Sequence, residues 1–442
     1  MSTAAPPRTE SQQGLFGLLL LVILAGIIGV FLGTDDMEVV RAGVILSMLT
    51  IVSLVLFWRV SRSDPQGARL LTVLLVSFVF KLLMGAFRHY GGLLADAYAY
   101  DAAGQGFASR WLMRGEWPEH LLTFGTPFVK LLVALAYYAT GVTFGGVTIL
   151  WAWFGLLGML FFHLAFSTAF PHGNRRLYTL LIFLYPSMLL WTSSLGKDAL
   201  VIMFLGMAAY GVARLQQRLG FVGLWWLAFG VSGAFMIRPH VVGVFLVAFG
   251  ASALILPIRA GLMTPIVRLA GVAILVGLSI IVVLSASDYA GVEELGAESV
   301  LESISSRQEQ SERGGSAFEQ VDVRSPLGLA MAVPTILFRP FPWEAHNTYA
   351  LVASLEGLGL LALIFFRRRS VAAAISTMFR NSYVLFISVY ILLFIFFFSA
   401  IGNFGIIARQ RASQLYPFIF MWVAFMAPRL TEKTDAGGER HP

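Results

Sequence analysis

Residues 42–58 read AGVILSMLTIVSLVLFW, an apolar run without a charged side chain between Arg41 and Arg59. A helix needs about 20 such residues to cross the roughly 30 Å hydrocarbon core of a bilayer. The chain contains twelve further apolar runs, and their number predicts an all-α, polytopic integral membrane protein. The other runs lie at 14–33, 70–88, 123–141, 146–168, 177–192, 198–213, 221–237, 241–257, 268–286, 347–366, 383–401 and 414–429.

The composition of the 442-residue chain excludes most other classes of protein. Charged residues make up 12% of it and apolar residues 58%, whereas soluble domains carry about 25% charged residues. The chain has no cysteine, which rules out a disulfide framework and a zinc–cysteine module. Its net charge of +7 is scattered between the apolar runs, so it does not indicate nucleic acid as a partner.

Arginine clusters between the apolar runs predict the cytoplasmic face, because short cytoplasmic loops are enriched in lysine and arginine. If every run crossed the membrane, these clusters could not all lie on one side. One of the runs 123–141 and 146–168 is therefore expected to be re-entrant, interfacial or tilted, which leaves about 12 crossings (roughly 11–13) with both termini inside. The clusters are Arg59/Arg62/Arg69, Arg175/Arg176, Arg214/Arg218, Arg259/Arg268 and Arg367/Arg368/Arg369.

Two larger polar stretches, both expected outside the cytoplasm, interrupt the apolar runs and divide the chain into four parts. The second stretch is followed by an apolar segment that Pro334, Pro340 and Pro342 break, which suits an interfacial element. The parts are 1–69, two helices and a basic cytoplasmic loop; 70–286, a transmembrane module with a first outer loop at 89–122; 287–346, the second outer loop and the interfacial segment; and 347–442, C-terminal helices and a cytoplasmic tail.

Several unusual polar groups lie one predicted crossing away from a cytoplasmic arginine cluster and are expected on the outer face. An arginine guanidinium group can bind two phosphate oxygens at once, and it keeps its charge when partly desolvated. Carboxylates beside them can accept a proton or hold a divalent ion. The convergence predicts an outer-leaflet pocket for a lipid phosphate. The groups are Asp96 with Asp101, Lys197 with Asp198, Arg238 with His240, Arg339 with Trp343, Glu344 and His346, and Arg409 with Arg411.

Each of these groups also has a purely structural interpretation. Arg238 can cap the C-terminus of a helix, and Asp198 is favoured in the first turn of one. Trp343 suits an interfacial anchor. Arg409 and Arg411 can bind lipid headgroups without any further role.

Two ionisable residues fall inside apolar runs, where such a residue is a functional hypothesis by default. Lys81 lies in the outer half of its run, and we expect its side chain to extend outward to the interface. Glu356 lies near the middle of its run. A functional role and a role as a paired or protonated group both stay open for Glu356.

Residues 96–118 read DAYAYDAAGQGFASRWLMRGEWP and follow an early apolar run. They resemble the first extracytoplasmic loop of GT-C glycosyltransferases that use polyprenyl-phosphate sugars, the protein mannosyltransferase and aminoarabinose transferase type. Asp96 matches the leading aspartate of that loop, Tyr100 its tyrosine, and residues 115–117 (GEW) its turn. Ala97 stands where the family has a second acidic residue. The proline before Asp198 and the stretch 402–418 are similar to later outer loops.

The resemblance implies an inverting sugar transfer, with Asp96 as general base on an acceptor hydroxyl and Asp101 as the second candidate. Arginine or lysine would hold the leaving lipid phosphate. No cofactor is implied, although two carboxylates five residues apart admit a divalent cation. The residues expected to bind substrate are Tyr100, Lys197, Asp198, Arg238, His240, Arg339, Glu344, His346, Arg409 and Arg411.

The partners implied are a polyprenyl-phosphate-linked sugar, a glycan, lipid or protein acceptor, and membrane lipids. The implied location is the extracytoplasmic face of a bacterial cytoplasmic membrane, in cell-envelope glycan or glycolipid synthesis. Two alternatives stay open. A polysaccharide polymerase or ligase of the O-antigen type would need Arg339 and Arg411 and could dispense with the aspartates, and a lipid or solute transporter would depend on Glu356.

Overall fold

A computed structural model describes residues 8–92, 95–117, 119–255, 277, 326–345, 348–399 and 402–427. These residues form helices joined by short connections, and no β-strand occurs among them. The predicted crossing 268–286, apart from residue 277, and the polar stretch 288–324 lie outside the described residues.

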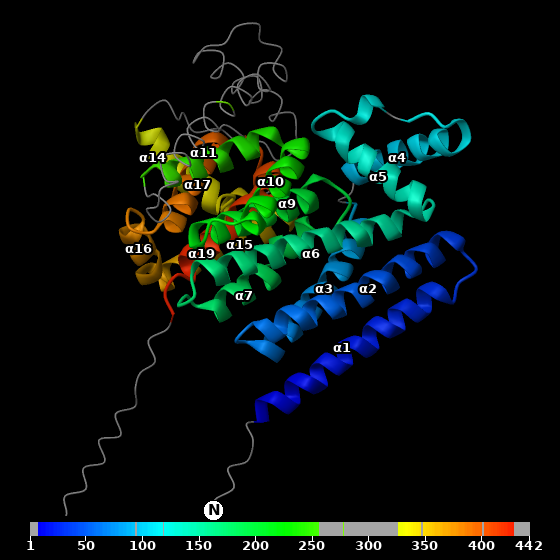
Figure 1. Cartoon of the computed structure of the whole chain (residues 1–442), viewed down its shortest axis with the longest axis horizontal. Coiled ribbons are helices and arrows are strands. Elements are labelled where there is room, and N and C mark those ends of the chain that lie inside the picture. Colours follow the sequence, from blue (N-terminus) through cyan, green and yellow to red (C-terminus); the bar gives the residue numbers. More distant parts are fainter. Residues whose placement is uncertain are drawn as a thin grey trace, which may run out of the picture.

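Figure 1 shows the helices in their chain order. The first half of the chain forms α1 (Arg8–Leu32), α2 (Met37–Ser63), α3 (Gly67–Tyr90), α4 (Ala95–Arg114), η1 (Glu119–Leu121), α5 (Thr126–Thr140), α6 (Phe144–Ala169), α7 (Arg175–Leu184), α8 (Pro186–Trp191) and α9 (Lys197–Gln217). The second half forms α10 (Phe221–Ile237), α11 (Pro239–Ile255), α14 (Pro326–Phe338), η2 (Pro342–Glu344), α15 (Thr348–Phe366), α16 (Arg368–Thr377), α17 (Ser382–Phe398), α18 (Phe404–Gln410), η3 (Arg411–Leu415) and α19 (Tyr416–Val423).

Four helices, α2, α3, α6 and α9, are long and apolar enough to cross a membrane. A fifth span results if α15 and α16, which meet at a bend of 70°, are counted as one. The chain is therefore a helical membrane protein, as its composition predicts.

The prediction of about 12 crossings is wrong for the described residues. Several apolar runs fold into helices of 10–17 residues, which rise only about 15–26 Å and fall short of the bilayer core. Proline accounts for the break inside one predicted run, since Pro186 divides 177–192 between α7 and α8. Hydropathy measures how apolar a run is, but not where its helix ends.

Close backbone contacts pack α6 and α10 against α9 (Figure 1). A Cβ atom added to Gly158 of α6 would lie 2.5 Å from the carbonyl of Ile202 in α9. A Cβ atom added to Gly230 of α10 would lie 2.4 Å from the amide nitrogen of Ala208 in α9. Glycine at these positions lets the helices touch, which is a common way to pack helices in a membrane.

Charged residues occupy both ends of three neighbouring helices. The end of α3, the start of α9 and the end of α10 meet around one cavity, and we call this side the pocket end. The opposite ends of these helices, which we call the basic end, carry Arg69, Arg214 and Arg218.

Candidate functional site

A polar pocket of about 290 Å³ lies where α3, α4, α8, α9, α10 and α18 end or begin. The residues that meet there are distant in the chain; Asp96 and Arg409, for example, are separated by 313 positions. Six of the residues that the sequence nominates for the site line this pocket: Asp96, Tyr100, Lys197, Asp198, Arg238 and Arg409.

The lining is dominated by positive charge. Arg88 joins Lys197, Arg238 and Arg409, so four cationic groups face two carboxylates and the lining is formally cationic. Helix ends and a partly desolvated cleft strengthen such a field, which favours an anionic ligand. The remaining lining residues are Ala97, Thr126, Trp191, Ser194, Leu195, Gly196, Ile406 and Gln410.

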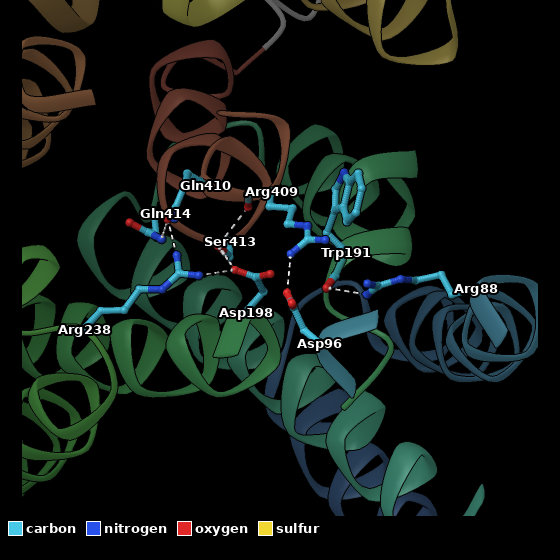
Figure 2. A network of polar contacts seen from close by, with 9 residues as sticks. All are labelled: Arg88, Asp96, Trp191, Asp198, Arg238, Arg409, Gln410, Ser413 and Gln414. Carbon is cyan, nitrogen blue, oxygen red and sulfur yellow. Dashed lines mark hydrogen bonds and ion pairs between the residues drawn. The ribbon is translucent and has the colours of Figure 1, made fainter. Parts of the chain in front are cut away.

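Asp96 is the exposed carboxylate of the pocket. It lies in the first turn of α4, its side chain is 68% exposed, and Arg409 donates to it at 2.9 Å. The Arg409 guanidinium also lies 5.3 Å from the centroid of the Trp191 ring, and the Arg88 guanidinium lies 5.2 Å from the same centroid. Arg88 donates to the Trp191 carbonyl at 3.3 Å and to the Ser194 hydroxyl. Trp191 therefore contacts both guanidinium groups on this side of the pocket (Figure 2).

Asp198 is the buried carboxylate, with 8% of the residue exposed. Arg238 donates to it at 3.0 Å, and the Ser413 hydroxyl, which donates to the Arg409 carbonyl at 3.0 Å, lies 3.4 Å from the same Asp198 oxygen. Arg238 also donates to the side-chain oxygen of Gln410, which in turn accepts from the Gln414 amide. Figure 2 shows these groups as one network that links α9, α10 and α18. The hydrogen bonds to Asp198 and Gln410 hold the Arg238 guanidinium group at the pocket wall.

A π-helical turn, η3, presents Ser413 and Gln414 to this network. Pro417 lacks the N–H that would bond the carbonyl of Ser413 in an α-helix, and the Tyr416 amide bonds instead to the carbonyl of Arg411, five residues back. The proline in the sequence is the local cause of a turn that brings both polar side chains to one side.

Lys197 differs from the other pocket cations because it forms no hydrogen bond or ion pair with any residue that the structure describes. It is the first residue of α9, and the preceding Gly196 offers no side chain to cap the first N–H groups of that helix. Burial raises the pKa of Tyr100, so its hydroxyl stays protonated and available for hydrogen bonding. An ammonium and an uncapped helix start thus lie on the same wall.

The structure does not bring the other nominated residues into the pocket lining. Asp101 accepts hydrogen bonds from Tyr137 and, at 3.0 Å, from Gln105, which give it a structural role in holding α4 on α5. His240, exposed near the start of α11, is also absent from the lining.

Two further nominated arginines are engaged elsewhere. Arg339 forms an ion pair with Glu344 at 2.6 Å. Arg411 is 1% exposed and donates to the carbonyls of Ile336 and Leu337 at 3.3 and 2.9 Å. His346 lies outside the described residues.

Sequence reasoning missed Arg88, Trp191, Ser194 and Gln410. Arg88 had a usable signal, because it ends the apolar run 70–88 on the face where arginine is unusual. Trp191 had none, since it falls at the end of an uncharged run that hydropathy assigns to the membrane, and Ser194, which follows that run, carries no charge.

The expectation for Lys81 is wrong. Its side chain does not extend to an interface but is 0% exposed, and its ammonium donates to Thr192 and Ser193. Glu356, whose role the sequence left open, accepts hydrogen bonds from the amide and hydroxyl of Ser187. Both side chains bond to the segment that leads into the pocket.

Among the described residues, no group of three or more histidines, aspartates and glutamates is placed to hold a metal ion. Comparisons with family models, with curated proteins and with solved structures gave no match. The chemistry of the pocket itself is therefore the basis for inferring a function.

Proposed function

We propose that this chain is a membrane glycosyltransferase that moves a sugar from a polyprenyl-phosphate donor to an acceptor. The acceptor is a glycan, lipid or protein, and the reaction serves cell-envelope glycan or glycolipid synthesis at the extracytoplasmic face of a bacterial cytoplasmic membrane. One observation carries the proposal: an exposed carboxylate, Asp96, shares a pocket with four cationic side chains at the ends of membrane helices.

The cationic lining fits the phosphate of such a donor. Lys197 forms no ion pair or hydrogen bond within the described residues, and it lies beside the uncapped start of α9, where N–H groups favour anions. The polyprenyl chain would stay in the bilayer while its phosphate enters between Lys197 and the guanidinium groups of Arg88 and Arg409. A lipid phosphate therefore needs no soluble domain to be bound.

Asp96 is the base in the proposed reaction. The acceptor oxygen attacks the anomeric carbon of the sugar, the bond from that carbon to the phosphate oxygen breaks, and its electron pair leaves with the polyprenyl phosphate. The hydroxyl proton of the acceptor passes to the Asp96 carboxylate. Arg409, which bonds Asp96 at 2.9 Å, would turn to the donor phosphate and leave the carboxylate available as a base.

The distribution of arginine supports an extracytoplasmic site. Arg69 near the start of α3 and Arg214 with Arg218 near the end of α9 lie at the basic end, away from the pocket. Arginine in short loops marks the cytoplasmic face. The pocket end of the same helices then faces the other side of the membrane.

The test is a transfer assay with membranes that contain the full chain. Polyprenyl monophosphate hexoses and pentoses, labelled in the sugar, should lose label to material that no longer carries the polyprenyl chain. Asp96→Asn should lower the rate by about 10²–10⁴-fold, the usual contribution of a general base. Glu119→Gln is the matched control, because Glu119 is an exposed carboxylate in the same outer segment that does not line the pocket.

Two results would contradict the assignment. If no polyprenyl monophosphate sugar is consumed by wild-type membranes, the proposed donor class is wrong. If Asp101→Asn abolishes transfer and Asp96→Asn does not, the base has been placed on the wrong carboxylate.

The same cationic lining also fits a lipid diphosphate, the substrate of a polysaccharide polymerase or ligase of the O-antigen type. Under that second candidate, Asp96→Asn would keep activity and the pocket arginines would be required. Arg339 and Arg411 give it no support, since both bond to groups outside the pocket.

A further inference from the structure

The segment 186–196, which we call the floor segment, consists of α8 and the five residues that follow it. Trp191, Ser194, Leu195 and Gly196 of this segment line the pocket. The position of the floor segment therefore sets where Trp191 meets the Arg88 and Arg409 guanidinium groups. Two ionisable side chains, the buried Lys81 and the partly buried Glu356, contact this segment at Thr192–Ser193 and at Ser187.

Lys81 holds the C-terminal part. Its ammonium, on a side chain that is 0% exposed, lies 2.8 Å from the Thr192 carbonyl, 2.7 Å from the Thr192 hydroxyl and 3.2 Å from the Ser193 hydroxyl. Lysine has three donors, and these oxygens provide three acceptors. Lys81 forms no ion pair with a described residue. Its bonds to the floor segment compensate for its burial.

The two hydroxyls extend this contact into α8. The Thr192 hydroxyl donates to the carbonyl of Met188, and the Ser193 hydroxyl donates to the carbonyl of Leu189. Carbonyls in the last turn of a helix lack partners within the helix and carry partial negative charge. The positive charge of Lys81 is thus relayed to the end of α8 where a cation is favourable.

Glu356 from α15 acts at the other end of α8. Its carboxylate accepts the amide of Ser187 at 2.9 Å and the Ser187 hydroxyl, and the Tyr185 hydroxyl donates to the Glu356 carbonyl at 3.2 Å. Amides in the first turn of a helix carry partial positive charge, which a carboxylate complements. The short helix α8 therefore has the Glu356 carboxyl group at its start and the Lys81 side chain at its end.

Two glycines let the floor segment lie directly against α6 and α3. A Cβ atom on Gly155 of α6 would lie 2.3 Å from the Thr192 carbonyl oxygen and 2.9 Å from the Lys81 ammonium. A Cβ atom on Gly85 of α3 would lie 2.8 Å from the Ser193 carbonyl oxygen. The segment is pressed directly against both helices.

We infer that Lys81 and Glu356 are positioning residues that hold the floor segment between them and so set the geometry of the phosphate-binding wall. Neither lines the pocket. They act through Trp191 and Ser194, which contact the pocket arginines. The inference rests on the proposed function only for the identity of the ligand.

A single cysteine at Gly196 reports on this geometry, because the chain has no cysteine of its own. A Cβ atom at Gly196 meets nothing within 4 Å, and its backbone is extended, with φ of 165°. The experiment measures modification of Gly196→Cys by anionic and by cationic methanethiosulfonates, with and without added polyprenyl monophosphate. The ratio of the two modification rates reports the charge around the cysteine. Slower modification in the presence of polyprenyl monophosphate reports binding of that lipid in the pocket.

Lys81→Met in the Gly196→Cys background should weaken protection by polyprenyl monophosphate about tenfold, since misplacement on the order of 1 Å is costly in a positioned site. It should also lower the preference for the anionic reagent. Glu356→Gln, which keeps an acceptor for Ser187, should have a smaller effect in the same direction. Lys130→Met is the matched control, because Lys130 lies outside the pocket lining.

Gly155→Ala tests the same contact without removing a charge, and it stands in if Lys81→Met does not fold. It should reproduce the loss of protection and of charge preference. Unchanged protection and rate ratio in Gly155→Ala and in a folded Lys81→Met would overturn the inference while the proposed donor stands. If polyprenyl monophosphate fails to protect the wild-type background but both substitutions change the rate ratio, the positioning role stands and the proposed donor falls.

Discussion

The two ends of α3, α9 and α10 both carry charge, but they differ in what the charges face. At the basic end, Asp64 is enclosed: its side chain is 7% exposed, and it lies 3.2 Å from His163 and 3.6 Å from Arg175. The nearby arginines lie over rings of their own helices, Arg62 at 3.8 Å from Trp58 and Arg214 over Tyr210. Each of these groups therefore has a partner among the described residues.

At the pocket end, the charges surround a cavity of about 290 Å³. Asp96 remains 68% exposed although it is paired, and Lys197 forms no ion pair or hydrogen bond within the described part of the chain. Charge at a helix end is thus no evidence of function by itself. The comparison shows that the useful distinction is between carboxylates whose partners enclose them and carboxylates that share a cavity with surplus cations.

The largest expected effect is a difference between the compartments that the two ends of α9 face. Gly196 and Gly220 flank α9 and both accept a Cβ atom without a neighbour inside 4 Å. In intact cells, a membrane-impermeant maleimide should label Gly196→Cys, after permeabilisation of any outer membrane, and leave Gly220→Cys unlabelled. The expected difference is all or none, because the bilayer excludes the reagent.

Opening the cells should make Gly220→Cys reactive, which controls for burial of that site. Labelling of both cysteines from outside would mean that α9 does not separate two compartments. Labelling of Gly220→Cys alone would reverse the orientation and remove the extracytoplasmic site from the proposal.

A smaller effect concerns the buried ion pair at the pocket end. Arg238 and Asp198 side chains are only 12% and 11% exposed. Arg238→Met should lower the stability of the detergent-solubilised protein by about 3–5 kcal/mol, because it leaves a buried carboxylate without its cation. Adding Asp198→Asn should recover part of this loss. Arg214→Met, at the exposed basic end, should change stability by less than about 0.5 kcal/mol.

Additive effects of Arg238→Met and Asp198→Asn in a thermal or denaturant double-mutant cycle would contradict this reasoning, since coupled residues give non-additive changes. The network that Gln410 and Ser413 form with this pair would then have to carry the stability on its own.

The sequence predicts those properties of the protein that depend on neighbouring residues alone. Membrane character follows from composition, and the placement of Asp96, Lys197, Asp198, Arg238 and Arg409 around one pocket follows from counting single crossings between arginine clusters. Each of those steps needs only the neighbouring loop. The grouping of distant residues could therefore be predicted even though the total number of crossings was wrong.

The failures share a physical cause. The expected outward extension of Lys81 treats its helix as if it faced lipid, whereas Thr192 and Ser193, over 100 positions away, surround its ammonium. Asp101 and Arg411 carry the right chemistry, but Tyr137 and the carbonyls of α14 engage them. Such partners come from packing between distant segments, which a pattern in one segment does not contain.

The surplus charge of the pocket end can be measured without knowing the substrate. In the Gly196→Cys background, Arg409→Gln should reduce the preference for an anionic over a cationic thiol reagent by at least about fivefold, since one unit charge about 4 Å away is worth about 1 kcal/mol even in bulk water. Arg218→Gln, at the far end of α9, should leave the ratio unchanged. An equal change in both variants would mean that the reagent senses net charge and not the pocket.

A further prediction concerns the enclosed carboxylate of the basic end, Asp64. Burial by itself raises the pKa of Asp64, but the hydrogen bonds from His163 and from the Gln66 amide, together with the charges of His163 and Arg175, outweigh it and hold the pKa below its ordinary value of 3.8. A carboxylate with a lowered pKa in the folded state stabilises the fold above its unfolded pKa, and that contribution is lost as the pH falls through the lowered value.

Asp64→Asn should therefore cost about 1–3 kcal/mol at neutral pH, the usual penalty for removing one partner of a buried charged hydrogen bond. The free energy of unfolding should be measured from pH 7 down to pH 3. The difference between Asp64→Asn and wild type should narrow below about pH 4, where an aspartate in the unfolded chain also takes up a proton. Asp35→Asn, at an exposed aspartate, should show no such gap. A gap that widens with acid would mean that the Asp64 cluster is strained and not stabilising, and the contrast between an enclosed and an open carboxylate would lose its physical basis.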